Sequence, residues 1–147
     1  MIFSAQQLFS DDQAITATAI STNVIDLGAR GTPYDAAAAL IGDIGKGVKI
    51  PILVQVTTTF ATLTSLTVTL ESDSVAGLSS SPVVAWSSGA IAAASLVQGY
   101  QFLIDVVPNG ITGRYLGLRY TVGGSNATAG NITAGIVMGV QTNITSA

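Results

Sequence analysis

Residues 100–141, YQFLIDVVPNGITGRYLGLRYTVGGSNATAGNITAGIVMGVQ, decide the fold. Three segments of this stretch alternate in side-chain character with a period of two. The segments are residues 100–107, 114–122 and 132–140. Successive side chains of a β-strand leave on opposite faces, so the alternation predicts strands of half-buried antiparallel sheet. A Pro-Asn-Gly turn follows the first segment, because Pro fixes φ while Asn and Gly tolerate φ > 0.

The same period recurs upstream, and turn signals separate the runs at a spacing of roughly 8–12 residues. This pattern predicts an all-β protein, an antiparallel β-sandwich that is jelly-roll-like and has about eight strands. We expect a single sandwich domain over residues 13–147, preceded by an N-terminal arm of residues 1–12. Pro51 places its strand at a sheet edge or marks the strand's first residues. The predicted core includes Ile52, Val54, Leu66, Val68, Leu70, Phe102, Ile104, Leu116, Leu118 and Ile136.

The surface of this chain is poor in charge. Charged residues make up 9% of the chain, against about 25% in a typical soluble domain. A monomer with so few charges is poorly protected against self-association, which predicts a protein that works in contact with other protein.

Several partners are not expected. The net charge is −3 and the five basic residues form no run, which argues against nucleic acid. No apolar run reaches the ~18–20 residues of a membrane span. The N-terminus lacks the basic and apolar regions of a signal peptide, so we expect a protein made and kept, or assembled, inside a cell.

Groups for catalysis are scarce. The chain has no histidine and no cysteine, which removes the usual general base, the thiol nucleophile and a thiolate metal site. We therefore predict no enzymatic activity, no metal and no cofactor. Most acids fall at predicted strand ends, in loops or in the arm, where solvated turn and cap roles are expected. Asp105 lies within a predicted strand, and we expect it to be paired or hydrogen-bonded near Arg114 or Arg119.

Two segments are candidates for contact with a partner. Residues 29–47 resist assignment to a strand, although 36–41 could form one or two helical turns. A long glycine-punctuated loop costs conformational entropy to order, so we expect a partner surface to hold it. The N-terminal arm carries apolar groups that need cover. The candidate contact residues are Phe3, Leu8, Phe9, Arg30, Tyr34 and Lys46. The alternative is that both segments pack across the open ends of their own sandwich.

Seven segments occur in an order that resembles a known family. They are TNVIDLG (22–28), DIGKG (43–47), PILVQV (51–56), LTVTL (66–70), GYQF (99–102), GRYLGLRYTV (113–122) and ITAGIV (132–137). This set is similar to the capsid cement proteins of the Bordetella tailed phage and its relatives. The resemblance covers nearly the whole chain, from about residue 9 to residue 141, and its motifs are structural.

The resemblance implies a jelly-roll-like sandwich on the outer surface of an icosahedral phage head. It further implies a homodimer that bridges capsomers of the major capsid protein, and hence a place in the virion. The motifs assign no binding residue.

Two other functions are compatible with the residues. A carbohydrate- or receptor-binding module would need an exposed aromatic platform, for which Trp86 and four tyrosines are available. A self-assembling surface-layer or fibre subunit is the other alternative.

Overall fold

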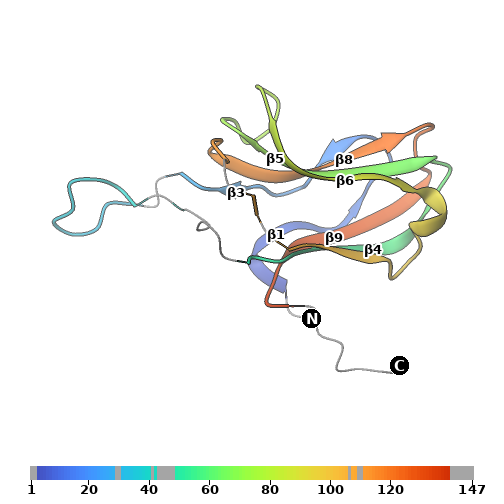
Figure 1. The fold of residues 1–147 in the computed structure, drawn as a ribbon, viewed down its shortest axis with the longest axis horizontal. Coiled ribbons are helices and arrows are strands. Elements are labelled where there is room, and N and C mark those ends of the chain that lie inside the picture. The colour runs from blue at the N-terminus through green and yellow to red at the C-terminus, as the bar shows by residue number, and fades with distance from the viewer. Residues whose placement is uncertain are drawn as a thin grey trace.

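The computed structural model describes residues 3–28, 31–40, 42, 49–105, 107–108 and 111–139. Within them the chain forms two antiparallel sheets that face each other as the layers of a β-sandwich (Figure 1). The strands are β1 (Phe3–Ala14), β2 (Ala19–Ile20), β3 (Ile25–Asp26), β4 (Ile52–Ala61), β5 (Ser65–Asp73), β6 (Val83–Ala92), β7 (Gln101–Ile104), β8 (Tyr115–Gly123) and β9 (Ala129–Val137). A single 3₁₀ turn, η1 (Ala93–Ser95), links β6 to β7.

The strand order is that of a jelly roll. The four-stranded sheet runs β1-β9-β4-β7, and the five-stranded sheet runs β2-β8-β5-β6, with β3 also paired to β8. If β2 and β3 count as one interrupted strand, the sheets have the orders first-eighth-third-sixth and second-seventh-fourth-fifth. Two sheets of four strands in this order form a jelly roll. The prediction of a jelly-roll-like β-sandwich with about eight strands is confirmed.

The core lies between the two sheets. Eight of the ten predicted core residues are buried, while Phe102 and Ile136 are partly buried and pack against the others. Tyr120 of β8 is also fully buried, and its hydroxyl lies 2.7 Å from Ser10 Oγ of β1. This hydrogen bond ties the two sheets together through the core, and burial raises the pKa of the Tyr120 phenol.

The three strands of residues 100–141 do not lie side by side. Strands β7 and β9 belong to the four-stranded sheet, whereas β8 belongs to the five-stranded sheet. Alternation shows that each strand has one buried face, but it carries no information about which sheet the strand joins. Pro51 directly precedes β4, which is an interior strand between β9 and β7. The interpretation of Pro51 as a strand start is therefore right, and the edge position is wrong.

The predicted N-terminal arm lies in the sheet. From Phe3 onward it forms β1, so the expected boundary at residue 12 falls inside a strand. Strand β1 pairs with β9 through three register shifts, between Phe3 and Leu8, Leu8 and Ser10, and Ser10 and Gln13. Each bulge adds residues without a partner and breaks the period of two. This explains why the segment shows no strand pattern in the sequence.

The helical turns that residues 36–41 could form are absent from the described part, residues 36–40. The chain reverses there instead. The Ala36 N–H donates to the Pro33 carbonyl at 3.1 Å, and the Leu40 N–H donates to the Gly31 carbonyl at 2.9 Å.

Candidate contact surfaces

The described residues hold no cluster suited to metal chemistry. No group of three or more His, Cys, Asp or Glu side chains comes together in them. Nor does this part of the chain contain a helix long and apolar enough to cross a membrane. What distinguishes the molecule is its surface: a projecting loop, an apolar patch on one sheet and a folded hairpin end on the other.

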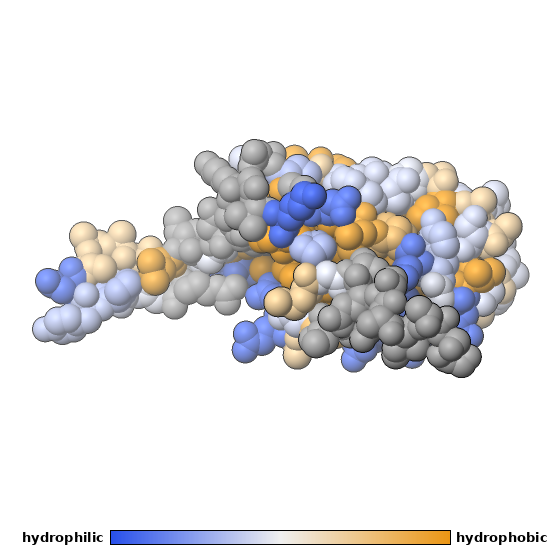
Figure 2. Space-filling view, turned by 60° about the horizontal axis from the view of Figure 1, so that its bottom comes forward, coloured by the Kyte–Doolittle hydropathy of each residue, from blue (hydrophilic) through white to orange (hydrophobic). Residues whose placement is uncertain are grey.

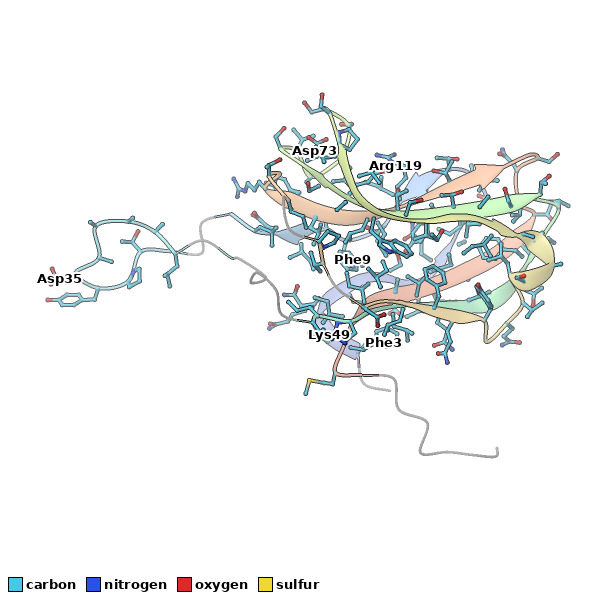
Figure 3. All side chains as sticks on the ribbon, viewed as in Figure 1. Phe3, Phe9, Asp35, Lys49, Asp73 and Arg119 are labelled. Atoms are coloured by element: carbon cyan, nitrogen blue, oxygen red, sulfur yellow. The ribbon has the colours of Figure 1, made fainter. Side chains whose placement is uncertain are left out.

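The projecting loop, residues 31–40, extends away from the sandwich (Figure 1, Figure 2). Tyr34 has an exposed fraction of 101%, so none of the residues that the structure describes covers its ring. Leu40 is also exposed, and Asp35 lies near the end of the loop (Figure 3). The hydrogen bond between Leu40 and Gly31 closes the loop on itself. An aromatic ring is therefore held well clear of the body of the protein.

The base of this loop is tied to the five-stranded sheet. Arg114 donates two hydrogen bonds to Asp26, from Nε and from a terminal nitrogen, each at 2.8 Å. The Asp26 carboxylate also accepts the Gly28 N–H, and this pairing holds the pKa of Arg114 above its usual range. A Cβ at Gly28 would collide with the Arg114 side chain. Glycine at this position makes room for a bidentate pair, the most directional kind of ion pair.

A second apolar surface lies on the outer face of the four-stranded sheet. Ala134 of β9 points into the core, so its neighbour Gly135 faces outward. A Cβ at Gly135 would lie 2.9 Å from Leu8 Cδ1 and 3.2 Å from Phe3 Cδ1, which places both apolar side chains over the glycine. Apolar residues gather on the face turned toward the viewer in Figure 2.

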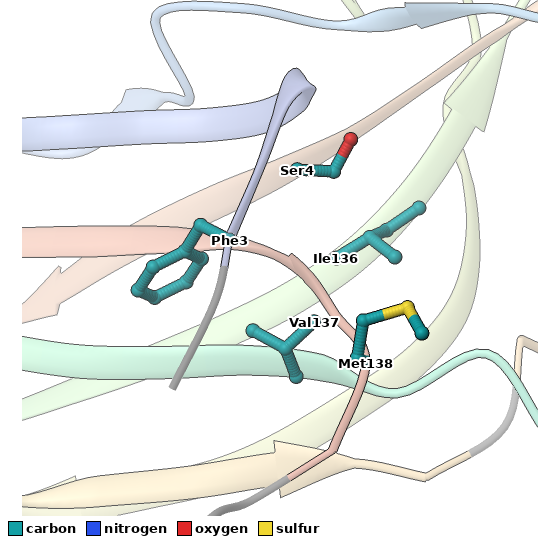
Figure 4. Close-up of a pocket in the computed structure, with 5 residues that line it drawn as sticks. All are labelled: Phe3, Ser4, Ile136, Val137 and Met138. Atoms are coloured by element: carbon teal, nitrogen blue, oxygen red, sulfur yellow. The ribbon is translucent and has the colours of Figure 1, made fainter.

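A groove adjoins this patch. It has a volume of about 270 Å³ and is lined by Phe3, Ser4, Ile136, Val137 and Met138 (Figure 4). Met138 is 91% exposed, which is unusual for a large apolar side chain. We call the set Phe3, Leu8 and Met138 the outer patch. It combines exposed apolar atoms with a depression that a partner side chain can enter.

The end of the β5–β6 hairpin is folded around buried acids. Asp73 accepts backbone hydrogen bonds from Ser74 at 2.6 Å, Ser80 at 2.8 Å and Ser81 at 3.4 Å. Burial by itself raises the pKa of Asp73, but these bonds and one from the Ser74 hydroxyl bring it below its ordinary value.

Arg119 strengthens the same hairpin end. Its Nε donates to Glu71 at 2.8 Å, and a terminal nitrogen donates to the Leu78 carbonyl at 2.6 Å. Leu78 is buried over Gly117, where a Cβ would lie 2.9 Å from Leu78 Cδ1. The expectation that Glu71 and Asp73 are solvated is wrong, because both are buried and hydrogen-bonded.

The ion pairs also correct the expectation for Asp105. Arg114 binds Asp26 and Arg119 binds Glu71, while Asp105 is exposed just beyond β7. The sequence shows only which residues share a strand. The partners of both arginines come from strands that lie far away in the chain.

The structure separates the predicted contact residues. Phe9 is fully buried between the sheets (Figure 3), so its side chain offers no surface to a neighbour. Phe3 and Leu8 are partly exposed in the outer patch, and Tyr34 is exposed in the projecting loop. Arg30 and Lys46 lie outside the described residues. Met138 was missed, because the alternation places it inside the predicted strand of residues 132–140, whereas β9 ends at Val137.

Comparison with known families assigns the chain to one of them. A family model named Bbp16 matches residues 9–136, most of its length. The chain belongs to the Bbp16 family. The family carries the name of a Bordetella phage protein, so this Bbp16-family member is a phage-related protein. No curated protein matches the chain.

Proposed function

We propose that this Bbp16-family protein is a structural virion protein. It binds the outside of an icosahedral phage head and cements adjacent capsomers of the major capsid protein. The observation that carries the proposal is the projecting loop on a phage-related sandwich, with Tyr34 exposed at 101%. A sandwich that presents an exposed tyrosine ring is suited to contact with protein, because tyrosine is enriched at the centres of interfaces.

The loop should lose little conformational entropy when it binds a partner. Its ends meet through Leu40 and Gly31, and its base is held by the Asp26–Arg114 pair. A loop that is already closed loses less conformational freedom when a partner orders it. Full burial of a large apolar side chain contributes about 1.5–3 kcal/mol. One such ring gives modest affinity for each contact.

Modest affinity is sufficient for a cement protein. A shell offers many equivalent sites, and a ligand that binds only the assembled state stabilises that state by mass action. A copy that touches two capsomers also gains from effective concentration at its second contact. The outer patch is the candidate for this second contact, because it lies on the body of the sandwich and not on the loop.

A carbohydrate- or receptor-binding module has less support. Trp86 is half-buried and stacks on Phe102 with ring centroids 6.1 Å apart. Tyr100 is tilted against the same Phe102 at 6.2 Å. Because Trp86 and Tyr100 pack against Phe102, they present no open platform for a sugar.

The proposal is tested by adding purified protein to phage heads that lack it and measuring bound copies by co-sedimentation. We expect saturable binding by the wild type and by Tyr34→Phe, which keeps the ring, but at least about tenfold weaker binding by Tyr34→Ser. Met138→Lys, in the outer patch, should also weaken binding. If the wild type does not bind heads, the proposal is wrong. If Tyr34→Ser binds like the wild type, the loop is not the contact.

A further inference from the structure

Strand β1 is fixed to the sandwich much more firmly in its second half than in its first. In the second half, Phe9 is fully buried in the core, and Ser10 hydrogen-bonds to Tyr120 across the core. The Gln13 amide donates to a backbone carbonyl of β2, which belongs to the other sheet. Residues 9–14 are therefore tied to both layers of the sandwich.

The first half, residues 3–8, has no such ties. Among the described residues, its side chains make no hydrogen bond or ion pair with the rest of the molecule. Between the pairs Phe3–Val137 and Leu8–Gly135, five steps along β1 correspond to two steps along β9, so three residues of β1 bulge out of the ladder. Most of the bulge is exposed. This half is held mainly by the apolar side chains beneath it.

These side chains form a second apolar cluster, separate from the core. Leu53 of β4 has an exposed fraction of 1% and Val137 of β9 has one of 3%, yet neither belongs to the core cluster. Ile52 and Val54 point into the core, so Leu53 between them points outward. Val137 follows the inward-facing Ile136 and likewise points outward. The burial of this pair requires a cover on the outer face of the four-stranded sheet.

The first half of β1 lies over this pair. Leu53 is opposite Gly135 in the β4–β9 ladder, and opposed residues share a face of the sheet. Leu8 and Phe3 lie over that same glycine, since a Cβ on it would be 2.9 Å from Leu8 Cδ1 and 3.2 Å from Phe3 Cδ1. Phe3 is also paired with Val137, beside which it lies in Figure 4.

We propose that residues 3–8 are a strap that opens on its own and uncovers Leu53 and Val137 while the sandwich stays folded. Opening breaks the contacts of Phe3 and Leu8 and a few backbone hydrogen bonds. It leaves the anchored half of β1 and the whole core in place. Segments with few buried contacts open at a free energy well below that of global unfolding. This inference goes beyond the proposed function and does not depend on it.

The strap changes how much apolar surface the molecule presents. In the closed state the groove of about 270 Å³ is lined in part by Phe3 and Val137. When the strap leaves, this groove becomes continuous with the face over Leu53, and β9 loses its β1 partner from Gly135 to Val137. Large exposed apolar patches promote association. A chain with few charges therefore keeps an apolar face covered until the strap opens.

The absence of cysteine allows a direct test by single-cysteine labelling. Leu53→Cys carries the thiol under the strap, and Ile52→Cys, its neighbour in β4, carries it in the core. Each full-length variant reacts with excess dithionitrobenzoate over a range of urea concentrations below its unfolding transition. We expect Leu53→Cys to react at least about tenfold faster without urea. Its rate should also depend much less on urea, because local opening exposes little surface.

A second pair of variants protects the test against a folding defect in the first. Val137→Cys places the thiol under the strap and Ala134→Cys places it in the core, and both positions belong to β9. The same difference in rate and in urea dependence is expected. Circular dichroism and urea unfolding of each variant show which pair is folded and comparably stable.

Two substitutions in the strap identify it as the cover. Leu8→Ala, combined with Leu53→Cys, removes apolar contact between the strap and the sheet and should speed labelling by at least about fivefold. Gln6→Ala is the matched control, because residue 6 is an exposed position of the same segment. It should leave the labelling rate unchanged.

Two results would overturn the inference. Equal rates with equal urea dependence within both cysteine pairs would mean that the outer face opens only when the whole sandwich unfolds. Labelling of Leu53→Cys that is not accelerated by Leu8→Ala would mean that the strap is not the cover. These measurements use no phage heads, so their failure and the failure of the cement function are distinguishable.

Discussion

The addition of a single methyl group at Gly113 should lower the free energy of unfolding. A Cβ there would lie 2.7 Å from the Ser72 carbonyl carbon and 2.8 Å from that of Asp73, and closer still to the Asp73 backbone nitrogen. These are backbone atoms at the end of β5, so they cannot move aside by a rotamer change. We predict that Gly113→Ala destabilises the protein by about 1–3 kcal/mol, measured by urea denaturation.

Gly139 is the matched control, because a Cβ added there meets nothing within 4 Å. Gly139→Ala should leave the free energy of unfolding unchanged within roughly 0.5 kcal/mol. Equal stability of the two variants would show that Gly113 lies farther from the backbone of Ser72 and Asp73 than these distances require.

Asp73 gives the stability a defined dependence on pH. Its pKa is lowered in the folded state, so its contribution to stability is complete above the ordinary value of 3.8 and is lost as the pH falls through the folded pKa. We predict that the wild type is more stable than Asp73→Asn at pH 7 and that the difference shrinks below about pH 3.8. Urea midpoints of both proteins between pH 7 and pH 3 test this. A difference that is constant with pH would contradict it.

Among the strands, β5 is the one in which a substitution tests the core most directly. It is an interior strand between β6 and β8, and Val68 in its middle is fully buried. We predict that Val68→Ala costs roughly 1–3 kcal/mol through lost burial and the cavity left behind. Thr67 lies beside it in β5 and is only partly buried, so Thr67→Ala should cost less. If the two variants unfold at the same urea concentration, Val68 does not face the core.

The strands with an unbroken period could be predicted from the sequence. The alternation alone is enough to predict strand β5, which has Leu66, Val68 and Leu70 on its buried face. Strand β1 could not be predicted, because its bulges interrupt the alternation of side chains by which a strand is recognised in a sequence. The distribution of strands between sheets also could not be predicted, since β8 shares its alternation with β7 and β9 but joins the other layer.

The positions of the candidate contact residues were predictable in part, for a different reason. Tyr34 lies in a loop punctuated by glycines, and such loops run over the surface. Phe9 looks like Phe3 in the sequence, yet Phe9 is in the core and Phe3 lies on the outer face. A bulge decides which of the two points inward. The two arginine pairs, Asp26–Arg114 and Glu71–Arg119, depend on strand pairing over long distances in the chain and leave no local signal.

For the whole molecule, the distribution of charge and apolar surface matters more than any single group. Charged residues are 9% of the chain, and residues 74–104 hold none of them. The exposed apolar side chains are divided among the projecting loop, the outer patch and residues 75–97, which include β6. A protein arranged in this way has three surfaces that protein contacts can cover. A cement protein that bridges neighbouring capsomers needs more than one such surface.

The proposed stabilisation of a phage head by this protein is tested most directly by heating. Heads with and without the bound protein are warmed in the presence of a dye that reports released DNA. We predict that decorated heads release their DNA at a higher temperature, because binding to the assembled shell stabilises that state. Heads that release DNA at the same temperature with and without the protein would contradict it.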